Sequence, residues 1–182
     1  MVNEIRVAAR KLAVDRVEGV IFRPRLNPKH IESNKEILSI FHHTETPVVL
    51  IDSDISPRPE RSDCDLVAVD NVSAGRRIAA HLLETGRRRL SFMMSGVEIG
   101  SNANWENRLF GIAGEVAVRG MDDESFARSS VPPLTTIRQP AGLIAKTVIK
   151  TLLARIRYPQ NDHREILLDA PLIIRKSSDR RP

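Results

Sequence analysis

Short apolar runs alternate with amphipathic stretches along this chain. The runs are brief, rich in Val, Ile and Leu, and followed by polar residues, as is typical of buried strands. They predict strands at residues 20–22, 48–51, 66–69, 90–94, 166–168 and 172–174. Elsewhere apolar residues recur every three or four positions, as in helices with one buried face. They predict helices near residues 5–13, 29–43, 71–84, 103–119 and 141–158.

Strands of continuous apolar residues that alternate with helices indicate an α/β fold. The sheet is predicted to be parallel, with helices covering both faces. Such sheets bind ligands at the carboxyl ends of their strands. The polar residues at those ends are Arg23, Asp52, Asp70, Asn71 and Ser95.

Composition narrows the class of protein. The 182 residues allow one domain or two small lobes. A single cysteine, Cys64, excludes an internal disulfide and a zinc site of several thiolates. The apolar runs are too short for a membrane span, and the first ten residues do not form a signal-peptide pattern. We therefore expect a cytoplasmic protein without a membrane partner.

The basic balance of the chain does not by itself indicate DNA binding. Lys and Arg number 28 against 23 Asp and Glu, for a net charge of +5. Basic residues cluster at 87–89, along 146–157 and in the tail, but no helix-turn-helix or Cys/His finger accompanies them. We interpret them as solvated faces and a basic tail rather than a phosphate-binding surface.

Most motifs of cofactor and metal chemistry are missing. The chain has neither a phosphate loop nor a GxGxxG turn after a strand. The five histidines (residues 30, 42, 43, 81 and 163) lack metal-ligand spacing. Cys64 lies in a polar loop and is predicted to be an inert thiol. We expect no cofactor, no metal and no catalytic residue.

One enzyme-like pattern provides an alternative. Residues 48–54 resemble the strand and DxD opening of haloacid-dehalogenase-like phosphatases. In that interpretation Asp52 and Asp54 would hold Mg²⁺ while one of them attacks phosphorus. The later lysine and acidic motifs of that family are absent, so the two acids are also explained as strand-end residues that cap a loop.

Six segments, in order, resemble the LacI/GalR family of bacterial transcriptional regulators. They are residues 16–21 ("rVdGvI"), 46–52 ("iPvVliD"), 69–90 ("vDN…A…hLi..Ghrri"), 107–111 ("R.GF"), 133–140 ("PLTTvrqP") and 172–178 ("LvvReSs"). Each segment alone is only weakly specific for the family, but six segments in the family's order are jointly specific. The resemblance implies a type I periplasmic-binding-protein-like module and a regulator rather than an enzyme.

The resemblance also implies a mechanism and a site. Two lobes would close over a small effector, often a sugar, and closure would change how a homodimer holds DNA. In the family the arginine of "R.GF" faces the cleft, which makes Arg108 the first candidate ligand contact. Ser73 and Asp70 lie on a turn that approaches the same ligand. The plain alternatives are helix capping for Asp70 and Ser73, and an exposed helix residue for Arg108.

The chain also departs from the family pattern. It shows no helix-turn-helix, so DNA is expected to be reached only through a segment absent from this chain. Compared with the family, we expect the first strand, first helix and second strand of the N-terminal lobe to be missing. We also expect most of the C-terminal lobe to be missing between Gly120 and Pro132, including its "ND..A.G" and "GfDd" segments. We predict an N-terminal-type lobe from residues 1–94 with 138–158, and a remnant C-terminal-type lobe from 95–137 with 159–182.

A reduced lobe has a physical consequence. One helix and two short strands bury little apolar surface, so we expect the chain to be marginally stable, oligomeric or partly disordered after Gly120. A remnant that dimerises without any ligand is the third functional possibility.

Overall fold

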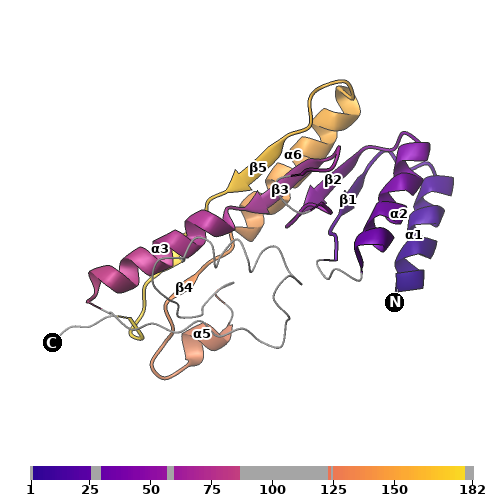
Figure 1. Cartoon of the computed structure of the whole chain (residues 1–182). Helices are drawn as coiled ribbons and strands as arrows, with labels where there is room; N and C mark the ends of the chain where they lie inside the picture. The colour runs from indigo at the N-terminus through magenta and orange to yellow at the C-terminus, as the bar shows by residue number, and fades with distance from the viewer. Residues whose placement is uncertain (1, 26–29, 57–59, 87–122, 124, 179–182) are drawn as a thin grey trace. The chain divides into compact units, whose positions relative to one another are not determined.

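The computed structural model describes residues 2–25, 30–56, 60–86, 123 and 125–178. Its elements, in chain order, are α1 (Val2–Val14), β1 (Val20–Phe22), α2 (Ile31–His43), β2 (Val48–Ile51), β3 (Asp65–Val69), α3 (Asn71–Glu84), α5 (Ser125–Ser129), β4 (Thr136–Ile137), α6 (Ala141–Arg157), β5 (Glu165–Leu168) and β6 (Leu172–Ile173) (Figure 1). The predicted elements outside residues 87–122 are confirmed to within a few residues. The predicted strand at 90–94 and helix at 103–119 lie outside the described residues, and α5 was not predicted.

The main sheet has four strands in the order β1-β2-β3-β5. β1 pairs with β2 in parallel, with Val20 opposite Val48, and β2 pairs with β3 in parallel, with Val49 opposite Asp65. β5 runs the same way, because the N–H groups of Leu66 and Asp70 donate to the carbonyls of Arg164 and Leu168 in matching order. The predicted parallel α/β fold is confirmed.

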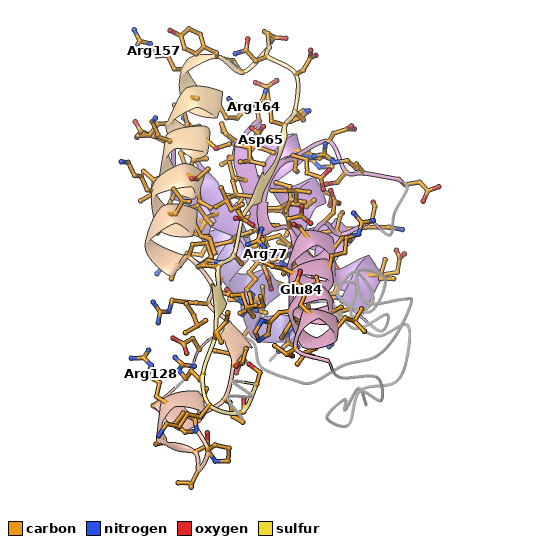
Figure 2. All side chains as sticks on the ribbon, turned by 90° about the vertical axis from the view of Figure 1, so that its left-hand side faces the viewer. Asp65, Arg77, Glu84, Arg128, Arg157 and Arg164 are labelled. Atoms are coloured by element: carbon orange, nitrogen blue, oxygen red, sulfur yellow. The ribbon has the colours of Figure 1, made fainter. Side chains whose placement is uncertain are left out.

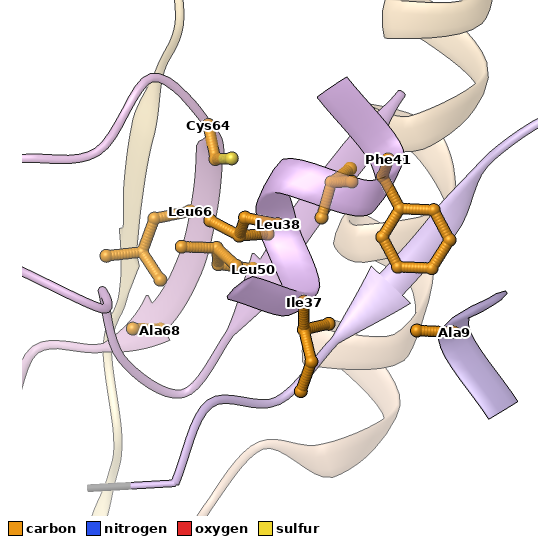
Figure 3. Packing of buried hydrophobic residues seen from close by; sticks show 9 residues of the cluster. Ala9, Ile37, Leu38, Phe41, Leu50, Cys64, Leu66 and Ala68 are labelled. Carbon is orange, nitrogen blue, oxygen red and sulfur yellow. The ribbon is translucent and has the colours of Figure 1, made fainter. Parts of the chain in front are cut away.

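The hydrophobic core lies between this sheet and helices α1 and α2. Phe41 of α2 is 1% exposed and Leu50 of β2 is fully buried. They pack with residues of α1, α2, β2 and β3, several of which are visible in Figure 3. Val20 and Phe22 of β1 pack against the same cluster. These contacts place α1 and α2 on one face of the sheet.

The helix α6 covers the other face. Side chains alternate between the two faces along a strand, so residues 19 and 21 point away from the side of Val20 and Phe22. A Cβ atom built on Gly19 would lie 2.8 Å from Cδ1 of Leu152 in α6. Val148 and Thr151 are the most buried apolar and hydroxyl side chains of that helix.

A second, two-stranded sheet forms with α3. β4 and β6 pair antiparallel, with Thr136 opposite Ile173. The hydroxyl of the buried Ser178 contacts that of Thr135 and lies 2.8 Å from Nε2 of His81, which is on α3. These contacts attach the chain after β6 to α3.

The described residues form two compact units. One contains residues 2–68 and 142–167, and the other contains 69–86, 123–141 and 168–178, within the described ranges. These boundaries differ from the predicted lobes of 1–94 with 138–158 and 95–137 with 159–182. The reason is that α3 contacts β4 and β6, while β5 lies beside β3. The identification of either unit with an N-terminal-type or C-terminal-type lobe stays a prediction.

No helix in the described part of the chain is both long and apolar enough to cross a membrane.

Candidate functional site

Two oppositely charged side chains meet at the carboxyl ends of adjacent parallel strands. Arg23 follows β1 directly, and Asp52 follows β2. Nη2 of Arg23 lies 2.8 Å and Nε 3.2 Å from Oδ2 of Asp52. The arginine side chain is 73% exposed and the aspartate 20%. The pair is therefore open to solvent at the edge where α/β sheets bind ligands.

The backbone of Asp52 is unusual. Its φ of +78° falls in the left-handed region, which residues other than glycine seldom adopt. Its N–H donates to the carbonyl of Val67 at 3.0 Å, so the residue is held at the end of the β2–β3 pairing. Backbone conformations that are rare for residues other than glycine occur often at functional sites.

Asp54 has a different role from Asp52. Its carboxylate accepts hydrogen bonds from the N–H groups of Ser56 and Ser62, at 3.0 and 3.2 Å, and lies 4.0 Å from Nε of Arg61. It therefore holds together the loop after β2. One acid pairs with an arginine and the other caps a loop, so the two do not form the shared Mg²⁺ site of the phosphatase alternative.

The predicted ligand residues of the second unit are placed only in part. The Asp70 carboxylate accepts the N–H of Ser73 at 2.9 Å and so caps the N-terminus of α3. The helix-capping explanation of Asp70 is thus correct, and it leaves a ligand contact by Asp70 or Ser73 untested. Arg108 lies outside the described residues.

Sequence reasoning missed a second ion pair at a strand end. Arg77 of α3 pairs with Asp169, which follows β5, and its Nη1 donates to the carbonyl of Ala170 at 2.8 Å. The hydrogen bond from Arg77 lowers the pKa of Asp169 below its usual value. No local pattern marks this pair, because its members are far apart in sequence.

Asp123 was also missed, and it is the charged centre of the second unit. The side chains of Arg138 and Arg175 donate to its two carboxylate oxygens, with Nε of Arg138 at 2.8 Å, and Arg128 lies 3.7 Å away. Burial of Asp123 opposes its ionisation, but the hydrogen bonds from Arg175 and Arg138 lower its pKa below the usual range. This charged centre joins α5 to the segments around β4 and β6.

Metal and thiol chemistry find no support in the described part of the chain. No group of three His, Cys, Asp or Glu side chains is placed to hold a metal ion within the described ranges. Burial, together with the charge of Asp54, raises the pKa of the Cys64 thiol to about 12. The thiol stays protonated at neutral pH, as expected for an inert core residue.

The chain is similar in sequence to known regulators. A family model described as a periplasmic binding protein-like domain matches residues 106–178. The ribose operon repressor of Haemophilus influenzae is 36% identical over 63 residues, which are 35% of this chain and 19% of that protein. An uncharacterized HTH-type transcriptional regulator in the aml 5' region of Streptomyces violaceus is 32% identical over 69 residues, 38% of this chain and 90% of that sequence. The match thus spans about a fifth of the ribose operon repressor's length.

Several solved structures share the fold of this chain. One is a complex of the transcriptional regulator CelR with cellobiose. Its alignment covers 96% of this chain and 70% of the CelR chain, with 19% identity and a TM-score of 0.74. Another is a LacI family transcriptional regulator from Enterococcus faecium with bound ribose. Its alignment covers 93% of this chain and 82% of that chain, with 18% identity and a TM-score of 0.69. At these identities the likeness concerns the fold.

The family-model match corrects one expectation from the sequence. It spans the interval from residue 120 to 132, in which we expected the "GfDd" segment to be missing. Residues 120–123 read Gly-Met-Asp-Asp, which fits three of the four letters of that pattern. The signal for Asp123 was therefore present in the sequence, and the prediction that this segment is absent was wrong.

Proposed function

The chain belongs to the LacI family of transcriptional regulators, and on this premise we propose that it is the effector-sensing part of such a regulator. It binds a sugar-like small molecule, and the bound molecule changes how a dimer attaches to DNA. Its relatives are transcriptional regulators, so the phosphatase alternative built on Asp52 and Asp54 is set aside and the chain is not an enzyme.

The observation that carries the proposal is the exposed Arg23–Asp52 pair at the ends of β1 and β2. A carboxylate accepts hydrogen bonds from sugar hydroxyls, and a guanidinium donates several in a fixed fork. The adjacent ends of β1 and β2 present both groups side by side. Two of the similar structures hold a sugar, cellobiose in one and ribose in the other, which supports this ligand class.

Three residues of the second unit are also proposed as ligand contacts. Arg108 is assigned through the "R.GF" resemblance, and Asp70 and Ser73 through their position at the start of α3. The cap hydrogen bond occupies Oδ1 of Asp70, so a ligand would use its second oxygen or the Ser73 hydroxyl.

The partners follow from the same proposal. The chain forms a homodimer, as does the lac repressor of similar fold. It reaches DNA through a helix-turn-helix segment that this chain does not contain, since its relatives are HTH-type regulators. A protein that acts on the chromosome of a bacterium works in the cytoplasm, which is where we place it.

Calorimetric titration of the purified chain with ribose and with cellobiose tests the proposal. We expect one of these sugars to bind, and Asp52→Asn to weaken binding by about tenfold, roughly 1.4 kcal/mol, because an amide replaces a charged acceptor. Asp15→Asn is the control, since Asp15 is an exposed acid beyond the end of α1. Equal affinities of the two variants would remove Asp52 from the site, and failure of both sugars to bind would contradict the proposed ligand class.

A further inference from the structure

A buried asparagine of α2 holds the chain just after β1. Asn34 is 3% exposed. Its Nδ2 donates to the carbonyl of Arg25 at 2.9 Å, and its Oδ1 accepts the N–H of the same residue at 3.2 Å. An amide side chain carries both an acceptor and donors, so it can bond a residue's main chain as a neighbouring strand would. β1 ends at Phe22, and Asn34 therefore replaces for Arg25 the pairing that the sheet supplies to β1.

The backbone of Arg23 is restrained on both sides. β1 ends directly before it, and the buried Pro24 follows it. Proline has a fixed φ and restricts the residue before it to extended conformations. The next residue, Arg25, is held by Asn34. Only the exposed side chain of Arg23 is left to adjust to Asp52 or to a ligand.

The backbone of Asp52 is held in a corresponding way by Asp54. The carboxylate of Asp54 is 10% exposed, and it accepts the N–H groups of Ser56 and Ser62. It thereby ties the start of the loop after β2 to the end of that loop. A left-handed φ such as that of Asp52 persists only where surrounding contacts hold it. Asp54 supplies these contacts on the loop side, and the hydrogen bond to Val67 supplies them on the strand side.

Asn34 and Asp54 thus do the same work at neighbouring strand ends. Both side chains are largely removed from solvent, and both accept hydrogen bonds from main-chain N–H groups. Each fixes the chain two residues after a member of the ion pair. Contacts of this kind set the geometry of a site, because the groups that meet a ligand are only as well placed as the backbone that carries them.

We propose that Asn34 and Asp54 are positioning residues of the effector site, which hold the backbones of Arg23 and Asp52 so that the ion pair keeps one geometry. This inference rests on the proposed function and adds two residues that do not touch the ligand. An effector then meets a carboxylate and a guanidinium already in place, so less conformational entropy is lost on binding. Without either side chain the pair samples more geometries, and the affinity for the effector falls.

The side-chain Nε–H of Arg23 reports on this geometry in the ligand-free chain. Its nitrogen lies 3.2 Å from Oδ2 of Asp52, so its hydrogen exchanges with water more slowly while the pair is held. Proton NMR in mildly acidic buffer measures the exchange, and Arg23→Lys assigns the signal. Asn34→Ala and Asp54→Ala should each speed the exchange by about fivefold, the factor that one hydrogen bond is worth. Arg23 is exposed and exchanges by local opening, so a variant that lowers only the global stability leaves this rate unchanged.

Matched variants separate positioning from a general effect of substitution. Ser33→Ala, at the buried neighbour of Asn34, and Asp63→Ala, at an exposed acid in the loop of Asp54, should leave the exchange rate of Arg23 unchanged. Asp54→Asn keeps an oxygen acceptor and should restore most of the protection. Circular dichroism checks that each variant is folded. If Asn34→Ala does not fold, Asn34→Ser, which keeps a hydroxyl acceptor, takes its place.

Calorimetric titration with ribose and with cellobiose measures the consequence for binding. Asn34→Ala and Asp54→Ala should each weaken binding of the sugar that the wild-type chain binds, by about tenfold. Asp54 acts through Asp52, so the double variant of Asp52→Asn and Asp54→Ala should bind about as weakly as Asp52→Asn alone.

Three results would overturn the assignment. One is an exchange rate of Arg23 that is the same in both alanine variants as in the wild-type chain. Another is an unchanged sugar affinity in both. The third is a double variant whose loss of affinity is the product of the two single losses, which would make Asp54 a direct ligand contact. If the wild-type chain binds neither sugar, the proposed function fails, whereas the exchange rates still decide whether Asn34 and Asp54 position the pair.

Discussion

At the scale of single residues, Asp65 and Arg155 form a buried ion pair in the first unit. Asp65 is fully buried and Arg155 is 6% exposed. Nε of Arg155 lies 2.9 Å from Oδ2 of Asp65, and its Nη1 and Nη2 donate to the carbonyls of Pro159 and Asp162. The arginine thereby joins α6, the start of β3 and the loop before β5 (Figure 2 labels Asp65 at this end).

Removing this arginine should destabilise the fold severely. Arg155→Ala removes the closer charged partner of the buried Asp65 carboxylate and leaves Arg164, whose Nε lies 3.6 Å from it. Breaking a buried ion pair costs about 3–5 kcal/mol in proteins. Urea denaturation followed by circular dichroism measures the loss. Arg157→Ala, two residues along the same helix but exposed, should change the unfolding free energy by less than about 0.5 kcal/mol. Similar losses for the two variants would show that the buried pair does not stabilise the chain.

Two buried acids make stability depend on pH. Burial of Asp65 opposes its ionisation, but hydrogen bonds from Arg155 and Arg164 lower its pKa below the usual value, and the pKa of Asp123 is lowered in the same sense. A depressed pKa in the folded state means that stability is present above the unfolded pKa of about 3.9 and is lost as the pH falls through the folded value.

Urea midpoints measured from about pH 7 down to about pH 3 should therefore stay level at first and then fall below about pH 4. Asp123→Asn should flatten part of that fall, because the neutral amide no longer takes up a proton. Asp15→Asn, at an exposed acid, should leave the profile unchanged. A midpoint that stays constant down to the lowest pH would contradict the assignment.

At the scale of elements, α3 has well-defined ends. Asp70 caps its N-terminus through the N–H of Ser73, and Gly86 follows its C-terminus with a φ of +79°. Capping by Asp70 was predicted from its residue type, and a glycine just after the helix is the residue type that most readily adopts the left-handed conformation. Local chemistry at these two positions sets the bounds of the helix.

Loss of the cap should lower the free energy of unfolding by a small, measurable amount. Asp70→Ala should lower the unfolding free energy by about 1 kcal/mol, whereas Asp70→Asn, which keeps an oxygen acceptor, should stay within a few tenths. Thermal unfolding of the two variants distinguishes these outcomes. If asparagine costs as much as alanine, the stabilisation comes from the charge of Asp70 rather than its hydrogen bond.

Alanine substitutions at Gly86 and Gly142 separate the effect of backbone conformation from that of available space. Gly86→Ala places a Cβ in a left-handed conformation and should destabilise by about 1 kcal/mol, although open space surrounds the site. Gly142 lies in the first turn of α6 with equally open surroundings and no positive φ, so Gly142→Ala should be neutral or stabilise by up to about 1 kcal/mol. Chemical denaturation compares them, and an equal loss in both would refute the role of backbone conformation.

At the scale of the whole molecule, the proposed dimer should make the melting temperature depend on protein concentration. A chain that folds as a dimer is stabilised by association, so its melting temperature rises with protein concentration. Calorimetry over a roughly hundredfold range of concentration measures this rise. A constant melting temperature and a monomer in sedimentation would remove the dimer from the proposal.

The sequence by itself determined most of the secondary structure, the parallel α/β class and the family. These follow from local rules: apolar periodicity separated strands from helices, and the capping residue Asp70 marked the start of α3. The position of Asp52 at a strand end was likewise predictable, because it follows directly from where β2 stops.

Tertiary structure alone decided which distant residues meet. Arg155 with Asp65, Arg77 with Asp169 and the arginines around Asp123 are separated by many residues in sequence, so no periodicity reports their contact. The same holds for the membership of α3 and β5 in the two units and for the side of α6 that packs against the sheet. Periodicity shows that a helix face is apolar, but only packing shows whether another element covers it.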